Sequence, residues 1–226
     1  NNWQDELWLV AGGIFGGSLY FFTENTALGI TQASNVSFII CTAPLLTTIL
    51  SLLFYKSEKA SKGLIYGSLL ALMGVGLIVF NGSFVLKISP IGDLLTLLAA
   101  LSWAFYSLII KKMAGRYPTI FITRKIFFYG VLTILPAFLL HPLHPDTVVL
   151  LQPAVLFNLL FLAVLASLIC YVLWNVVLKQ LGTVRASNYI YLNPLVTMIA
   201  SFLILDEKIT LVALGGAACI VCGVYW

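Results

Sequence analysis

Long apolar stretches, separated by short polar segments, set the pattern of the chain. A helix needs about 20 apolar residues to cross the roughly 30 Å hydrocarbon core of a bilayer. Eight stretches come close to or exceed this length: Leu7–Ile30, Ala33–Tyr55, Gly63–Phe80, Asp93–Met113, Thr119–Leu140, Ala154–Leu181, Thr183–Leu205 and Ile209–Trp226. A soluble α/β core would instead show short strands and helices with a polar stripe, and neither pattern is present. The pattern predicts an all-α polytopic membrane protein.

Composition supports the same class. Hydrophobic residues make up 61% of the chain and charged residues 9%, and the mean hydropathy is +1.06. These values lie far outside the range of soluble globular domains.

The basic residues predict the orientation of the helices. If the chain starts inside, ten Lys and Arg residues fall on the inner side and only Lys87 and Lys208 on the outer side. The inner ten are Lys56, Lys59, Lys62, Lys111, Lys112, Arg116, Arg124, Lys125, Lys179 and Arg185. This is the positive-inside bias of membrane proteins. The net charge of +4 therefore reflects topology, and because the basic clusters lack interleaved aromatic residues we expect no nucleic-acid partner.

Metal-binding and catalytic patterns are weak. All four cysteines lie within apolar stretches, and the Cys219 and Cys222 pair has neither a second pair nor a nearby His to complete a metal site. His141 and His144 in "HPLHPD" suit either a metal ion or a solvated Pro-rich turn, and the turn is favoured. No phosphate-binding glycine loop or catalytic triad is recognisable. We therefore expect a protein that is not an enzyme and that needs no cofactor or metal.

Part of the chain repeats itself. "PLLTTILSLLFYKSEK" from Pro44 aligns with "PLVTMIASFLILDEK" from Pro194, 150 residues later. Upstream, "GITQASN" from Gly29 matches "GTVRASN" from Gly182. Downstream, after one deletion, Gly67 and Gly74 match Gly216 and Gly223. The first three predicted helices thus correspond to the last three.

The repeat predicts an architecture with two oppositely oriented units. The second unit, residues 93–226, has five helices, an odd number, so two tandem copies must cross the membrane in opposite directions. Residues 1–80 then form the last three helices of the first unit. The sequence supplies eight helices in all, and the two opening helices of the first unit are expected to be missing. Inverted repeats of this kind are typical of secondary transporters.

The sequence resembles the EamA-like ten-helix transporters of the drug/metabolite transporter superfamily. The resemblance is carried by "GDLLTLLAALSWAFYSLIIKKM", Gly92 to Met113, and by two helices that each combine a mid-helix Pro with a terminal Glu-Lys. It covers nearly the whole chain from Leu7. It implies ten helices, a central substrate cavity and alternating access, in a multi-pass protein of the plasma membrane, the inner membrane of bacteria.

Glu24 is the one carboxylate well inside a predicted span. It lies about 9 Å from the outer end of its helix at 1.5 Å per residue, and an acidic group at the centre of a membrane helix costs roughly 2.5–3.5 kcal/mol. Tyr20, one turn earlier, is placed to hydrogen-bond it. Three roles remain open for Glu24: counter-ion to an amine substrate, proton-coupling group, or structural acceptor for a neighbouring helix.

Other polar and aromatic residues recur at helical spacing and predict an amphipathic cavity. Together with Glu24 and Tyr20 the candidate substrate-binding residues are Trp103, Ser107, Trp174, Asn175, Asn188 and Asn193. An interfacial aromatic belt with interhelical amide bonds is the alternative.

The matched prolines predict helix bends, and the hydroxyl pairs beside them predict two gates. The gating candidates are Pro44, Pro194, Thr47, Ser51, Thr197 and Ser201. Hydroxyls bonded to the preceding helical turn are the alternative to gates.

These observations predict a permease, acting as an exporter of small organic metabolites such as amino acids, amines or drugs. The expected partners are the substrate and the bilayer, with proton coupling left open, and the expected state is a monomer. A passive channel is the alternative, and an intramembrane enzyme is a weaker one because Glu24 has no catalytic partners in the sequence.

Overall fold

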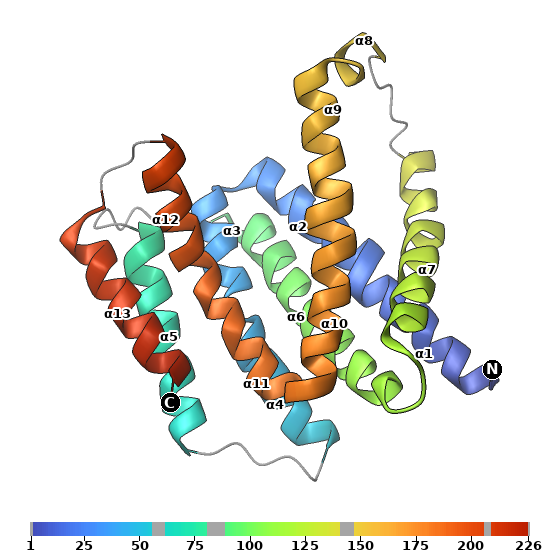
Figure 1. Cartoon of the computed structure of the whole chain (residues 1–226), viewed down its shortest axis with the longest axis horizontal. Coiled ribbons are helices and arrows are strands. Elements are labelled where there is room, and N and C mark those ends of the chain that lie inside the picture. The colour runs from blue at the N-terminus through green and yellow to red at the C-terminus, as the bar shows by residue number, and fades with distance from the viewer. Residues whose placement is uncertain (1, 56–61, 81–88, 141–146, 206–208, 226) are drawn as a thin grey trace.

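A computed structural model describes residues 2–55, 62–80, 89–140, 147–205 and 209–225, and the regular elements within these ranges are all helices (Figure 1). The first span is a continuous rod made of α1 (Trp3–Gly13), a π-helical turn η1 (Ile14–Ser18) and α2 (Leu19–Ile30). It begins at Trp3 and not at the predicted Leu7. Asp5 and Glu6 lie in its first turn, where the positive end of the helix dipole favours carboxylates.

The remaining elements follow the predicted stretches in order. They are α3 (Ala33–Ile40), α4 (Ala43–Phe54), α5 (Lys62–Phe80), α6 (Pro90–Ala114), α7 (Thr119–Leu140), α8 (Thr147–Leu150), α9 (Pro153–Leu160), π-helical η2 (Phe161–Ile169), α10 (Cys170–Leu181), α11 (Thr183–Asn188), 3-10 turn η3 (Tyr189–Leu192), α12 (Asn193–Leu205) and α13 (Leu211–Tyr225). The predicted all-α membrane class is confirmed. His141 and His144 lie outside the described residues.

Length and apolar composition suit several helices to crossing a membrane. Within the described residues five segments meet both conditions: Asn35–Phe54, Lys62–Phe80, Pro90–Ala114, Thr119–Phe138 and Pro153–Leu181. Leu211–Tyr225 is apolar but shorter. Large apolar side chains on the outer surface, such as Phe157 and Leu203 at 70% and 72% exposed, suit contact with lipid.

The two matched prolines each follow a break in a span. Helix α3 ends at Ile40, and α4 begins at Ala43 with Pro44 as its second residue. In the second span α11 ends at Asn188, and the 3-10 turn η3 interrupts the α-helical pattern before α12 begins at Asn193 with Pro194 second. Proline suits the first turn of a helix because its missing N–H would have no partner there. The predicted bends therefore take the form of breaks, at positions 150 residues apart.

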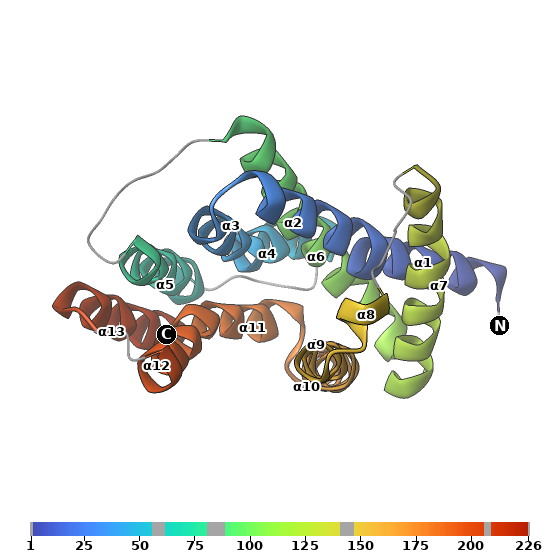
Figure 2. The ribbon, with the colours of Figure 1, turned by 90° about the horizontal axis from the view of Figure 1, so that it is seen from above.

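The helices form two facing groups. Seen from above, α10, α11 and α12 lie along one side and α2, α3, α4 and α6 along the other, while α5 and α13 run together at one edge (Figure 2). Contacts between the sides include α4 with α11 and α6 with α10. A buried cluster around Tyr106, Ile110, Ile126 and Leu178 joins α6, α7 and α10.

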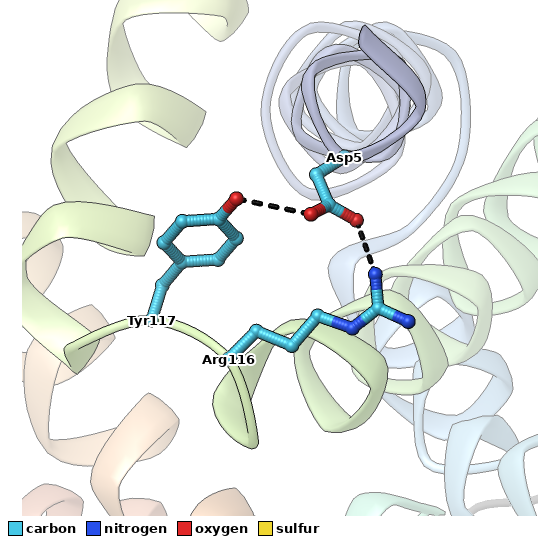
Figure 3. Close-up of polar contacts among 3 residues, drawn as sticks. All are labelled: Asp5, Arg116 and Tyr117. Carbon is cyan, nitrogen blue, oxygen red and sulfur yellow. Dashed lines mark hydrogen bonds and ion pairs between the residues drawn. The ribbon is translucent and has the colours of Figure 1, made fainter. Parts of the chain in front are cut away.

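Ionic contacts fasten the start of α1 to the α6–α7 connection and to α7. Asp5 accepts hydrogen bonds from Arg116 Nη1 at 2.6 Å and from the Tyr117 hydroxyl at 3.0 Å (Figure 3). The bond to Asp5 raises the pKa of the Tyr117 phenol, because ionising the phenol would remove the donor. Nearly two turns into α7, Lys125 pairs with Glu6 at 2.6 Å, and the Tyr129 hydroxyl also donates a hydrogen bond to Glu6.

Candidate functional site

A cavity of about 510 Å³ lies between the two groups of helices. Its lining comes from α2, α3 and the end of α5 on one side, and from α12 and the start of α13 on the other. Five of the residues predicted from sequence line it: Tyr20, Glu24, Asn193, Pro194 and Thr197. Its volume lies within the roughly 300–1,000 Å³ typical of small-molecule sites.

The cavity lies toward one end of the molecule. Leu28 and Ala33 line it where α2 gives way to α3, Val79 lines it at the end of α5, and Ile209 lines it just before α13. All four positions lie at the end of the molecule that the distribution of basic residues predicts to face outward.

Glu24 forms the charged part of the cavity wall. The Tyr20 hydroxyl donates a hydrogen bond of 3.0 Å to Glu24 Oε1, as the spacing of one helical turn predicts. Both residues line the cavity, and Glu24 is half-buried. A carboxylate held by one neutral donor keeps free acceptor capacity, so Glu24 is able to bind a cation or a proton donor that enters the cavity.

The opposite wall is built at the second helix break. Asn193 and Pro194 are the first two residues of α12, and Thr197 follows one turn later. The break thus places an amide and a hydroxyl across the cavity from Glu24. The side chain of Ser201, another gating candidate, lies outside the part that the structure describes.

An aromatic cluster packs behind Tyr20. The rings of Tyr20 and Trp103 have centroids 5.1 Å apart, and those of Trp103 and Trp174 are 5.7 Å apart. Both indole N–H groups are buried, and neither has a hydrogen-bond acceptor among the described residues. Ser107 on the same helix donates to the carbonyl of Trp103 at 2.9 Å. Trp103, Ser107 and Trp174 lie outside the lining of the 510 Å³ cavity.

Asn175 is engaged within the protein interior. It accepts from the Tyr106 hydroxyl at 2.7 Å and donates to Thr123 Oγ1 at 2.9 Å, so it ties α10 to α6 and α7. A nearby bond of 2.6 Å from the Tyr171 hydroxyl to the carbonyl of Gly16 links α10 to η1.

The remaining candidates lie between α4, α5 and α11. Asn188 accepts from Ser68 at 3.3 Å. The hydroxyls of Ser51 and Thr183 lie 3.4 Å apart, and Thr47 is buried on the same face of α4, one turn from Ser51. None of these residues lines the 510 Å³ cavity, and the Ser51 to Thr183 contact bridges the two groups of helices at the inner end of α4.

Sequence reasoning missed part of the cavity wall on α3. Ser37 and Cys41 line the cavity one helical turn apart. Their signal was the i, i+4 spacing of two small polar groups ahead of Pro44, but an apolar stretch of this kind offers many equivalent faces.

Comparison with known proteins identifies the family of the chain. The EamA-like transporter family model matches residues 1–80 and 90–226. A protein of Archaeoglobus fulgidus named "Uncharacterized transporter" is 30% identical over 213 residues, covering 93% of this chain and 72% of its own. A Salmonella typhimurium protein named "Probable amino-acid metabolite efflux pump" is 29% identical over 182 residues, covering 76% of this chain and 60% of its own. One solved structure shares the fold with a TM-score of 0.79 at 19% identity, covering 99% of this chain and 75% of that one.

The fold and the comparisons together define a polytopic helical membrane protein of the transporter class. The chain belongs to the EamA-like transporter family.

Proposed function

We propose that the protein is a secondary transporter that exports small organic metabolites such as amino acids, amines or drugs by alternating access. The observation that carries the proposal is the cavity between the two groups of helices, with Glu24 and Tyr20 on one wall and Asn193 and Thr197 on the other. The efflux-pump name of the Salmonella relative supports a metabolite as cargo and export as the direction.

Alternating access requires two units that move against each other. The proposed units are the last three helices of one repeat, residues 1–80, and a five-helix repeat, residues 93–226. The breaks before Pro44 and Pro194 occupy equivalent positions in the two units and supply the points at which each span bends. Breaks in membrane helices at matched positions are the pattern expected around a transporter's binding site.

The structure fits an outward-facing state of that cycle. The cavity lies at the outer end, whereas the hydrogen bonds between Ser51 and Thr183 and from Ser68 to Asn188 join the two proposed units further inward. To load substrate from the inside, an exporter must close this outer cavity and separate the inner contacts, and it must re-form them when the cavity opens outward to release the substrate.

Glu24 acts through its negative charge in this proposal. It either pairs with the amine of a substrate or carries the proton that couples transport to the pH gradient. In both roles the carboxylate changes partner during the cycle, which suits a group whose hydrogen-bond partner among the described residues is the neutral Tyr20 hydroxyl.

Flux into proteoliposomes tests the proposal. The intact protein is reconstituted, and uptake of a panel of labelled metabolites is measured with and without a pH gradient. A carrier shows saturation, and its labelled uptake is accelerated by unlabelled substrate on the opposite side. A passive channel shows neither effect, so flux that stays linear and indifferent to the opposite side would contradict alternating access.

A further inference from the structure

A second pocket, of about 390 Å³, lies between α1, α4 and α6, and none of its lining residues lines the first cavity. Three phenylalanines from three elements form its apolar wall. Phe105 of α6 lies 5.2 Å from Phe15 of η1 and 6.4 Å from Phe54 of α4, measured between ring centroids. The wall is therefore part of the packing between these three elements and offers apolar surface to an acyl chain.

The rim of this inner pocket is aromatic and positively charged. Trp8 and Tyr55 line it, and the ammonium groups of Lys112 and Lys111 lie over their rings, 3.7 Å and 4.3 Å from the respective centroids. Tryptophan, tyrosine and lysine are the residues that mark the level of lipid headgroups. The pocket thus combines an apolar interior with the cation of Lys112 in its lining and the cation of Lys111 beside it, over the ring of Tyr55.

The rim lies at the inner end of the molecule. Trp8 is in α1 near its start, Tyr55 follows the last residue of α4, and both lysines are in the last turn of α6. These are the helix ends that the distribution of basic residues assigns to the inner side. In bacteria the inner leaflet carries anionic lipids, and basic pockets between membrane helices on this side suit their head groups.

We propose that the inner pocket binds an anionic phospholipid, with an acyl chain against Phe15, Phe54 and Phe105 and the phosphate beside Lys111 and Lys112. The charge at the rim selects the head group, and the apolar wall holds the chain. A bound lipid would bridge α1, α4 and α6. Helices α4 and α6 belong to the group that carries Glu24, and α1 packs against α6.

Native mass spectrometry of the purified intact protein tests the selection. Phosphatidylglycerol and phosphatidylcholine with the same acyl chains are titrated separately, and phosphatidylglycerol is expected to bind more tightly. The Lys111→Gln/Lys112→Gln variant is expected to weaken phosphatidylglycerol binding by about thirtyfold, because two basic residues near a lipid head group together contribute about 2 kcal/mol. Its binding of phosphatidylcholine is expected to stay unchanged.

A matched variant separates the pocket from general surface charge. Lys179→Gln/Arg185→Gln removes the same charge from the inner ends of α10 and α11, away from the pocket, and is expected to leave the lipid affinity unchanged. Thermal unfolding in detergent checks that both variants are folded. An equal loss in both variants, or equal affinity for the two lipids, would overturn the proposal.

Photolabelling tests where the chain lies. Phosphatidylglycerol with a diazirine in the middle of one acyl chain is expected to label the peptides that contain Phe54 and Phe105. Labelling confined to other helices would contradict the assignment. An excess of inorganic phosphate is expected to leave the labelling intact. If phosphate abolished the labelling, the site would be one for free anions and the lipid proposal would be wrong.

Discussion

Gly74 of α5 faces Gly216 of α13 across a direct backbone contact. A Cβ atom on Gly74 would lie 2.5 Å from the carbonyl oxygen of Gly216, and one on Gly216 would lie 2.6 Å from that of Gly74. About two turns along the two helices, a Cβ atom on Gly223 would likewise meet the carbonyl oxygen of Gly67. The sequence repeat equates Gly67 with Gly216 and Gly74 with Gly223, so repeat symmetry would exchange the two contacts. This relationship supports the proposed pair of inverted units.

Replacing Gly216 by valine is expected to destabilise the packing of α5 against α13 by about 1–3 kcal/mol, the usual cost of overfilling a packed interior. The side chain would meet backbone atoms that cannot move aside independently. Gly215→Val is the control, because a Cβ at Gly215 meets nothing within 4 Å. Thermal unfolding in detergent measures both, and equal midpoints for the two variants would contradict the close contact.

Asn175→Leu is expected to cost about 1–2 kcal/mol of stability. The substitution leaves the hydroxyls of Tyr106 and Thr123 buried without the amide they now bond. Replacing Tyr106 by phenylalanine as well should recover part of the loss, because one unpaired group disappears. Additive losses in this double-mutant cycle would show that the bond contributes nothing.

The Asp5 contacts are expected to be unequal in strength. The side chain of Asp5 is 8% exposed and that of Arg116 is 56% exposed. Arg116→Gln should therefore cost under about 1 kcal/mol, with the loss shrinking at high salt. Asp5→Ala should cost more, since it also removes the acceptor for Tyr117. Unfolding at two salt concentrations measures both, and a larger loss for Arg116→Gln would reverse the ranking.

Pro194→Ala is expected to slow transport severalfold with little loss of stability. Pro194 lies in the first turn of α12, where alanine is tolerated, but without proline the helix is free to extend back through η3 and stiffen the break. Pro136→Ala is the control, since Pro136 lies inside α7 and lines neither cavity. Turnover that falls equally in both variants, or in neither, would reduce the break at Pro194 to a packing feature.

Five of the eight predicted stretches correspond to a helix long and apolar enough to cross a membrane, within the residues that the structure describes. The sequence predicts these because a bilayer requires long runs of apolar residues. It also predicted the bond between Tyr20 and Glu24, which depends only on helical spacing. The ionic contacts of Asp5 and Glu6 were not predicted. Their partners Arg116 and Lys125 lie more than 100 residues away, and only the packing of α1 against α7 brings them together.

The polar residues on inner helix faces were harder to assign. Asn175 and Asn193 have the same amide and are each flanked by apolar residues, yet Asn175 is bonded inside the protein and Asn193 lines the cavity. The difference comes from how α10 and α12 are rotated about their axes, which is set by contacts between distant helices. A single sequence does not contain that rotation.

Substitution of Glu24 by glutamine tests the central claim most directly. Glutamine keeps the size of the side chain and an acceptor for the Tyr20 hydroxyl but removes the negative charge. The measurement is flux of the identified substrate through the reconstituted intact protein as a function of pH, with Tyr20→Phe as the variant that keeps the charge and loses only the hydrogen bond. The account predicts that Glu24→Gln folds normally, transports at least about tenfold more slowly and loses its pH dependence, while Tyr20→Phe is affected less. Unaltered transport with unaltered pH dependence in Glu24→Gln would contradict a charged, substrate-handling cavity at this position.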